Sequence, residues 1–313
     1  MGIEVVLLSL GHGSDCDDAC GGDGGCAGGC GGNADLTGGV RVPVLTCRDA
    51  LRAGGASVRI VEANSDGEID QVIEDSLVDS DGRLVVVGNT DGEPRAVVRR
   101  MLRRFAPPPS RRPDDLPAGR TVPDLPPIGI LCLDPGGNDD LVARLDLPRD
   151  PAEVAAAVLA GRSTRFDLLR TDSGSVTLHG ALLGGADDAG RPVPWQAVVN
   201  VDDAVLSDGS DPLLACAVVN ASGAGYADVD GLPLVTRAEP GDGELDVAVA
   251  VLGFAGRRWL GTRRPRIEVR RARGRAVAVT PTGEVPFTDD GTTGTLTRKR
   301  TWWMEHGAWA VYR

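Results

Sequence analysis

Two turns that follow apolar stretches carry residue types that could bind phosphate. Their small, amide and acidic residues are Gly88, Asp91 and Gly92 in VVVGNTDGEPRAVV, and Gly136, Gly137, Asn138 and Asp139 in GILCLDPGGNDDLVARL. Each turn is predicted to join the C-terminal end of a strand to a helix, and ligands bind at that edge of an open α/β sheet. The free N–H groups at a helix N-terminus suit phosphate. One such turn is an ordinary connection, but the consecutive pair predicts a phosphate site.

Composition limits how such phosphates could be held. The chain of 313 residues has a formal net charge of −12, which argues against nucleic acid as a partner because phosphate backbones need a concentrated positive field. Lys299 is the one lysine in the sequence, so no Walker A loop with its Gly-Lys pair is present. Nucleotide phosphates would therefore rely on backbone amides, arginines or a metal ion.

The remaining composition is that of a soluble protein. Hydrophobic residues make up 42% and charged residues 25%, which is typical of globular domains. No apolar run approaches the roughly 20 residues of a membrane-spanning helix, and the first residues lack the features of a secretory signal. We therefore expect a cytoplasmic location.

The elements that must position the two turns fall into two parts. Up to about residue 165, strand and helix patterns alternate, which predicts a parallel sheet covered by helices. From residue 166, short β-rich runs separated by turns predict an antiparallel sandwich or barrel. We expect an α/β domain over 1–165, completed by the C-terminal segment 291–313, and a β-rich domain over 166–290. The active cleft would lie between them.

The order of motifs resembles a known family. After the two turns come LDLPRDPAEVAAAVLAGRSTRFDLLR, then VVNASGAG and DGELDV, and together they resemble the diacylglycerol kinase catalytic-domain family. That family includes bacterial lipid kinases and sphingosine kinases and is distantly similar to NAD kinases. The resemblance spans about residues 45–300. It implies ATP-dependent and Mg²⁺-dependent phosphorylation of a diacylglycerol-like hydroxyl lipid, with a nucleotide and a lipid alcohol as the partners.

The resemblance also implies roles for individual residues. The family's GGDGT turn corresponds to the turn with Gly88, Asp91 and Gly92, which would hold nucleotide phosphates and their metal. Its L-P-x-G-T-x-N-D motif corresponds to Leu131–Asp139 and implies the same role for Gly136, Gly137, Asn138 and Asp139. The aspartate of D-G-x-L-D corresponds to Asp242, the implied base for the lipid hydroxyl. The alternative for Asp242 is a plain turn before a strand.

Two departures from the family pattern favour a different function. Glu93 replaces the threonine of GGDGT, and a glutamate facing ATP phosphates repels them unless a metal lies between. The family's N-P-x-S-G turn after the first strand is absent, because a glycine-rich and cysteine-rich insert stands there. The alternative hypothesis is a non-catalytic member of the same fold that binds a nucleotide or lipid in a regulatory role.

The insert carries four cysteines with the spacing C-x3-C-x5-C-x3-C: Cys16, Cys20, Cys26 and Cys30. Two such pairs could supply four thiolates to Zn²⁺, and a metal-sensing or redox-sensing protein is therefore a third hypothesis. The neighbouring glycines and aspartates favour a solvated, mobile loop instead. Both interpretations stay open.

The segment from Arg298 to Trp303, RKRTWW, is a basic and aromatic patch in an acidic protein. Tryptophans beside basic residues are typical of contact with an anionic membrane surface, which would place the protein at the inner membrane face. The favoured alternative is a packed terminal strand that returns to the first domain.

Overall fold

The computed structural model describes residues 3–11, 41–78, 82–107, 109–113, 115–117, 119–134, 137, 139–223, 225–255 and 264–313. Cys16, Cys20, Cys26 and Cys30, predicted as zinc ligands, lie outside these residues, as do Gly136 and Asn138 of the second turn.

The first half of the chain alternates strands and helices, as predicted. The strands are β1 (Glu4–Leu10), β2 (Ser57–Ala63), β3 (Arg83–Gly88) and β4 (Pro127–Cys132). The helices are α1 (Val42–Ala53), α2 (Asp66–Ile73), α3 (Gly92–Phe105), α4 (Leu141–Arg144) and α5 (Pro151–Ala160), with short helical segments at Glu74–Val78 and Pro109–Arg111. β1 pairs in parallel with β2 and β3, and β3 pairs in parallel with β4.

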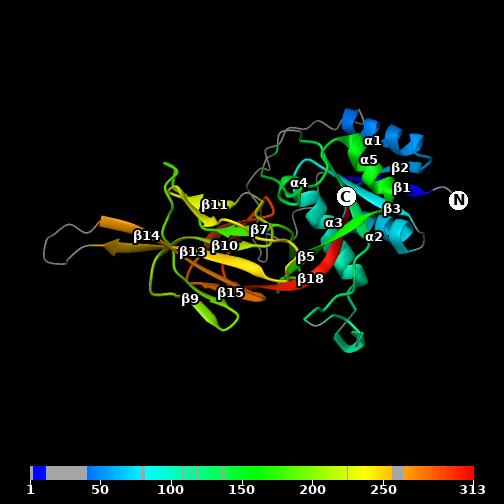
Figure 1. The fold of residues 1–313 in the computed structure, drawn as a ribbon. Coiled ribbons are helices and arrows are strands. Elements are labelled where there is room, and N and C mark those ends of the chain that lie inside the picture. The colour runs from blue at the N-terminus through cyan, green and yellow to red at the C-terminus, as the bar shows by residue number, and fades with distance from the viewer. Residues whose placement is uncertain are drawn as a thin grey trace.

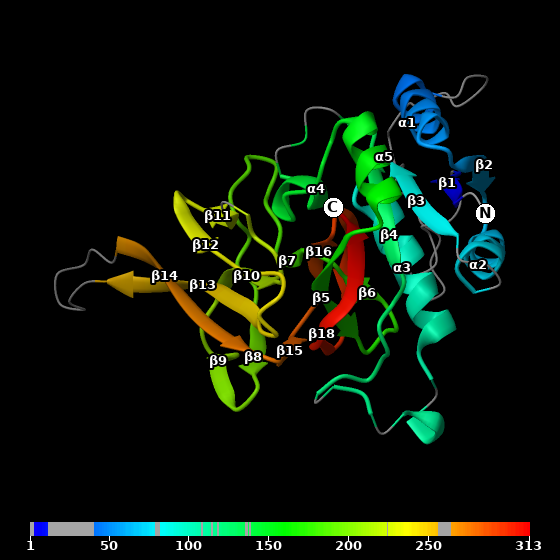
Figure 2. The same ribbon diagram turned by 45° about the vertical axis from the view of Figure 1, so that its right-hand side comes forward.

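Helices cover both faces of this parallel sheet because its strands are apolar on both sides. Along β1, Val5 and Leu7 belong to one core with residues of α1 and α5. The alternate residues Val6 and Leu8 belong to a second core with residues of α2 and α3. Figure 2 shows α1 beside α5, with α2 and α3 across the strands from them.

The second half is built from strands, again as predicted. They are β5 (Ser163–Thr171), β6 (Val176–Thr177), β7 (Gly180–Leu183), β8 (Ala197–Val201), β9 (Ala204–Asp208), β10 (Leu213–Val219), β11 (Tyr226–Val229), β12 (Leu232–Val235), β13 (Leu245–Ala255), β14 (Arg264–Gly274), β15 (Ala276–Pro281), β16 (Val285–Asp289), β17 (Thr292–Leu296) and β18 (Arg300–Tyr312). An antiparallel sheet runs in the order β14-β13-β10-β7-β16-β17. Its inner face shares a core with β8, β15 and β18, which makes this half a sandwich.

Strand β18 joins the two halves (Figure 1). It pairs in parallel with β4 through Ala310 and Val311 and antiparallel with β15 and β5. Trp302 is fully buried in the sandwich core. The expectation of a packed terminal strand is therefore confirmed for this residue. Among the described helices, none is long and apolar enough to cross a membrane.

Candidate functional site

The two predicted turns lie side by side at one edge of the parallel sheet. Gly88, the last residue of β3, pairs with Cys132, the last residue of β4, so both turns leave the sheet at the same place. Asp91 stands just before α3, and its Oδ1 accepts the N–H of Leu141, the first residue of α4, at 3.0 Å. The structure therefore links the turns directly. Their role in binding a ligand stays a prediction.

The second turn presents the carboxylate of Asp139 to solvent. The side chain of Asp139 is 86% exposed and pairs with Arg144. The side chain of Asp140 caps α4 by accepting the N–H of Ala143 at 2.9 Å, and it also pairs with Arg149. Asp140 is thus occupied in holding the helix, whereas Asp139 keeps an exposed carboxylate at the site.

The first turn already holds an anion of its own. One oxygen of Glu93 accepts the N–H of Asn89 at 3.0 Å, and the other accepts the N–H of Thr90 at 3.1 Å and the Thr90 hydroxyl. A Cβ on Gly88 would lie 3.1 Å from atoms of the Glu93 side chain, so a glycine is needed for this close approach. The Glu93 carboxylate therefore occupies the backbone N–H groups of Asn89 and Thr90.

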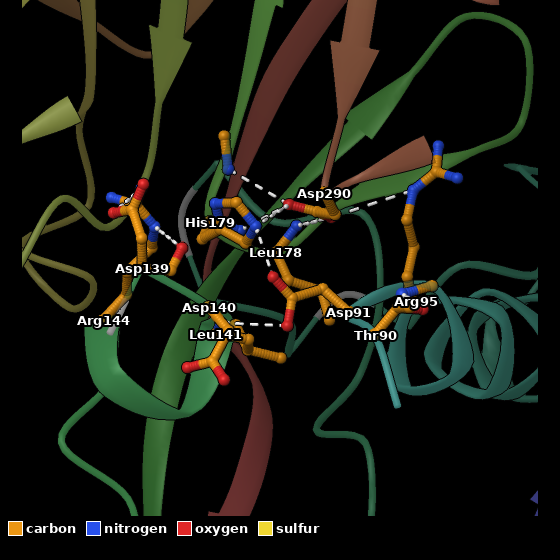
Figure 3. A network of polar contacts seen from close by, with 12 residues as sticks. Thr90, Asp91, Arg95, Asp139, Asp140, Leu141, Arg144, Leu178, His179 and Asp290 are labelled. Carbon is orange, nitrogen blue, oxygen red and sulfur yellow. Dashed lines mark hydrogen bonds and ion pairs between the residues drawn. The ribbon is translucent and has the colours of Figure 1, made fainter. Parts of the chain in front are cut away.

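The β-rich half contributes a buried histidine to the same site (Figure 3). His179 stands just before β7, and its Nε2 lies 2.9 Å from Oδ2 of Asp91 and 3.4 Å from Oδ1 of Asp290. Asp290 is fully buried and accepts the N–H groups of Leu178, His179 and Gly180 at 2.6, 2.9 and 3.1 Å. His179 therefore connects an aspartate of one half to an aspartate of the other.

The electrostatics favour a charged His179. Burial opposes the imidazolium form, but the nearby carboxylates of Asp290 and Asp91 outweigh it and raise the pKa of His179 above its ordinary value. A cation between two carboxylates offsets the repulsion that they would otherwise exert across the junction.

Two arginines fix the groups around this histidine. Arg144 of α4 donates to the carbonyls of Ser222 and Gly225, each at 3.1 Å, and its guanidinium carbon lies 4.7 Å from the ring centre of Tyr226. This cationic side chain crosses from the second turn into the β-rich half.

Arg95, one turn along α3, makes the second set of contacts. It donates to Ser175 Oγ at 2.7 Å, to the Val176 carbonyl at 2.8 Å and to Asp289 Oδ2 at 3.1 Å, and it lies 3.8 Å from Asp290. Burial raises the pKa of Asp289 although Arg95 opposes the shift. Arg95 thus compensates the pair of buried acids behind His179.

Asp242, the predicted base, lies in the turn before β13 and does not contact Asp91. Its Oδ1 accepts the N–H of Glu244 at 3.0 Å, and its Oδ2 pairs with Arg273. Asp246 of β13 pairs with Val219 of β10, and Val219 pairs with Gly180 of β7. The turn before β13 therefore lies at the same end of the sheet as His179, which precedes Gly180. Asp242 precedes β13, which is separated from β7 by one strand, β10. Its catalytic role stays a prediction.

Sequence reasoning missed His179, Asp290, Arg95 and Arg144. The run SVTLHG hides the histidine in an apolar strand pattern, and Asp290 resembles a simple turn residue in TDDGT. The available signal was weak: two adjacent aspartates directly follow an apolar strand, where only charge compensation allows burial.

The described residues contain no group of three or more His, Cys, Asp or Glu side chains placed to hold a metal ion.

Comparison with known proteins supports the fold. No protein-family model matches the sequence, and no curated protein matches it. A solved structure of a diacylglycerol kinase from Bacillus anthracis strain Sterne is similar, with a TM-score of 0.59 and 13% identity, over 99% of this chain and 96% of that chain. A second structure from that strain, with the same activity given provisionally, has a TM-score of 0.62 at 13% identity and the same coverage. The chain therefore has this two-domain, diacylglycerol kinase-like fold.

Proposed function

We propose that this chain is an ATP-dependent and Mg²⁺-dependent lipid kinase that phosphorylates a diacylglycerol-like hydroxyl lipid. The observation that carries the proposal is the convergence on Asp91. Its carboxylate is contacted by the second turn through Leu141 and by the β-rich half through His179. Groups from three segments thus meet at the sheet edge where α/β folds bind ligands. The likeness of the fold to diacylglycerol kinases over nearly the whole chain agrees with this function.

Phosphoryl transfer to a hydroxyl needs an aligned acceptor, a proton acceptor and neutralisation of phosphate charge. Mg²⁺ would supply charge neutralisation when bound beside Asp139. The backbone N–H groups of Asn89 and Thr90 would donate to phosphate oxygens once the Glu93 carboxylate has moved away from them. Asp242 would accept the hydroxyl proton from the facing half, after exchange of its contact with Arg273.

A second function is favoured by one observation. The Glu93 carboxylate holds the amides of the first turn, and phosphate must displace it. If it stays in place, the chain is a non-catalytic protein that binds a nucleotide or lipid at the remaining surfaces.

Replacement of Glu93 separates the two functions. Glu93→Thr removes the carboxylate and places a small hydroxyl in the turn. ATP affinity, measured by calorimetry with Mg²⁺, should rise by about tenfold or more because an anion that repels the phosphates is gone. Glu153→Thr, which removes a first-turn acid from α5, is the matched control and should leave ATP affinity unchanged.

Turnover is measured in the same preparations with labelled ATP and vesicles containing diacylglycerol. Phosphorylated lipid from the parent supports the kinase. ATP binding without turnover in either the parent or Glu93→Thr supports the non-catalytic function. Absence of ATP binding in both proteins would exclude the nucleotide site itself.

A further inference from the structure

A second polar pocket lies on the other side of Arg95 from His179. Its walls come from α3, the turn between β5 and β6, the β16–β17 hairpin and the start of β18. The groups that matter for binding are three arginines and the hydroxyls of the hairpin: Arg95, Arg99, Arg300, Thr292 and Thr293. None of these residues belongs to the two turns or to Asp242. The pocket shares Arg95 with the groups around His179 but is separate from the two turns and from Asp242.

Two of the arginines already have acidic partners. Arg95 contacts Asp289 and Asp290, and Arg99 contacts Asp66 at 3.3 Å. Asp289, the acid in the pocket wall, is fully buried and is compensated by Arg95. The wall therefore presents little uncompensated negative charge.

Arg300 differs from the other two. Among the described residues its guanidinium forms no hydrogen bond or ion pair, and its carbon lies 4.8 Å from the ring centre of Phe287. Asp289 and Asp172 are near enough to favour its charge, but burial outweighs them and lowers the pKa of Arg300. The guanidinium of Arg300 therefore keeps donors available to an anion that enters the pocket.

The remaining donors and the size of the pocket define the ligand. The hydroxyls of Thr292 and Thr293 also have no partner among the described residues. The pocket has a volume of about 20 Å³ and is partly open to solvent, so its interior has room for little more than one water-sized group. A base or sugar does not fit there, whereas one or two oxygens of a tetrahedral anion can enter while the rest stays outside.

We propose that this pocket, formed around Arg300 and Thr292, binds the terminal phosphate of a phosphate monoester. The guanidinium of Arg300 and the hydroxyl of Thr292 donate to its oxygens. Free inorganic phosphate and the headgroup of a phosphatidate lipid share this chemistry. The neighbouring Arg298 and Lys299 add positive charge on the chain segment that leads to the pocket.

Binding is tested with the full chain and sodium phosphate at constant ionic strength, by calorimetry and by the rise in midpoint of thermal unfolding. The parent should bind phosphate. Arg300→Gln should weaken binding by about ten- to a hundredfold, as expected for the loss of a charged hydrogen-bond partner. Thr292→Val should weaken it by about two- to tenfold. Neither measurement needs ATP or turnover, so failure here is distinct from failure of the proposed kinase function.

Arg298→Gln is the matched control because it makes the same change in net charge two residues away, outside the pocket wall. Its phosphate affinity should equal that of the parent. Equal losses in Arg298→Gln and Arg300→Gln would mean diffuse attraction and would overturn the pocket.

The source of the phosphate is identified with phosphatidylcholine vesicles that contain either phosphatidate, a monoester, or phosphatidylglycerol, a diester. Selective flotation with phosphatidate that is lost in Arg300→Gln assigns the pocket to a lipid headgroup. Saturable binding of inorganic phosphate alone assigns it to a soluble ligand. Binding of neither probe by the parent would overturn the proposal.

Discussion

At the residue scale, His179 is the group that allows Asp91 and Asp290 to face each other. The nearby groups from other elements are Arg144 of α4, which opposes its charge, and the ring of Tyr226, 6.0 Å away between centroids. Because His179 lies within 3.4 Å of two carboxylates, its protonation contributes to the stability of the junction.

The pH dependence of stability should show this contribution. The folded-state pKa of His179 is raised, so the stabilisation is fully present below the unfolded value of about 6.5 and is lost as pH rises through the folded value. His179→Gln replaces the imidazole with an amide that does not titrate in this pH range. The free energy of unfolding of the parent, relative to this variant, should therefore be largest near pH 6 and decline toward pH 9 in urea titrations. A constant difference over that range would show that folding leaves the pKa of His179 unchanged, and a difference that rises with pH would show that the fold keeps His179 neutral.

Sequence reasoning could place residues whose position depends on neighbours in the chain. Asp91 follows its strand by three residues, so strand and turn patterns were enough to place it. The contacts of His179 join positions 91, 179 and 290, and such contacts have no local pattern. The sequence predicted that Glu93 would repel ATP, but not that its carboxylate would accept the N–H groups of the first turn. Those hydrogen bonds depend on the exact path of the turn.

At the element scale, the side chain of Arg95 joins α3 to the β-rich half by hydrogen bonds and an ion pair. Arg95 is 11% exposed and reaches Ser175, Val176 and the buried Asp289. Arg103 on the same helix is 44% exposed and lies 3.9 Å from Asp66. The helix thus offers a buried arginine and a matched exposed one.

Removal of the buried arginine should be costly. Arg95→Met leaves Asp289 uncompensated, so the free energy of unfolding should fall by about 3–5 kcal/mol. Arg103→Met should change it by no more than about 0.5 kcal/mol. Denaturant titrations check both values. Adding Asp289→Asn to Arg95→Met should restore part of the lost stability. Equal stability of Arg95→Met and Arg103→Met would contradict this account.

Element types were predictable from local patterns, because β1 contains the apolar run at residues 5–8 and α5 has Asp150 as a cap, Pro151 in its first turn and Gly161 at its end. Elements formed by tertiary contacts were not. Strand β6 has two residues and α4 has four, which is too short for any period to show. The apolar context of Cys132 predicts a core position, but Cys132 is half-buried because it ends β4 beside the polar second turn.

At the scale of the whole molecule, the halves share a sheet. Within the described residues the order β2-β1-β3-β4-β18-β15-β8-β9 is continuous, so hydrogen bonds cross from one half to the other through β18. The sequence indicated that the C-terminal segment returns to the first domain. It did not show that the same strand also pairs with β15 and β5, since those partners depend on register over long separations. The predicted boundaries at 165 and 290 stay predictions.

Arg144 is a second connection between the halves, on the side of the two turns. It is buried, and its Nη1 donates to two carbonyls of the segment Ser222–Gly225. Arg149 lies five residues further along, is 27% exposed and pairs with Asp140 within the same half. Only the first of these arginines spans the junction.

Arg144→Gln should therefore loosen the junction without unfolding either half. The two carbonyls lose charged donors, and stability should fall by about 2–3 kcal/mol. Hydrogen exchange should accelerate at residues 220–226 and in α4, while the amides of β1 and β3, buried between helices, keep their protection because they open only with global unfolding. Arg149→Gln should accelerate exchange at α4 alone. If Arg144→Gln left residues 220–226 as protected as in the parent, β18 and His179 would be sufficient to hold the halves together, and the segment would owe its order to the sandwich core.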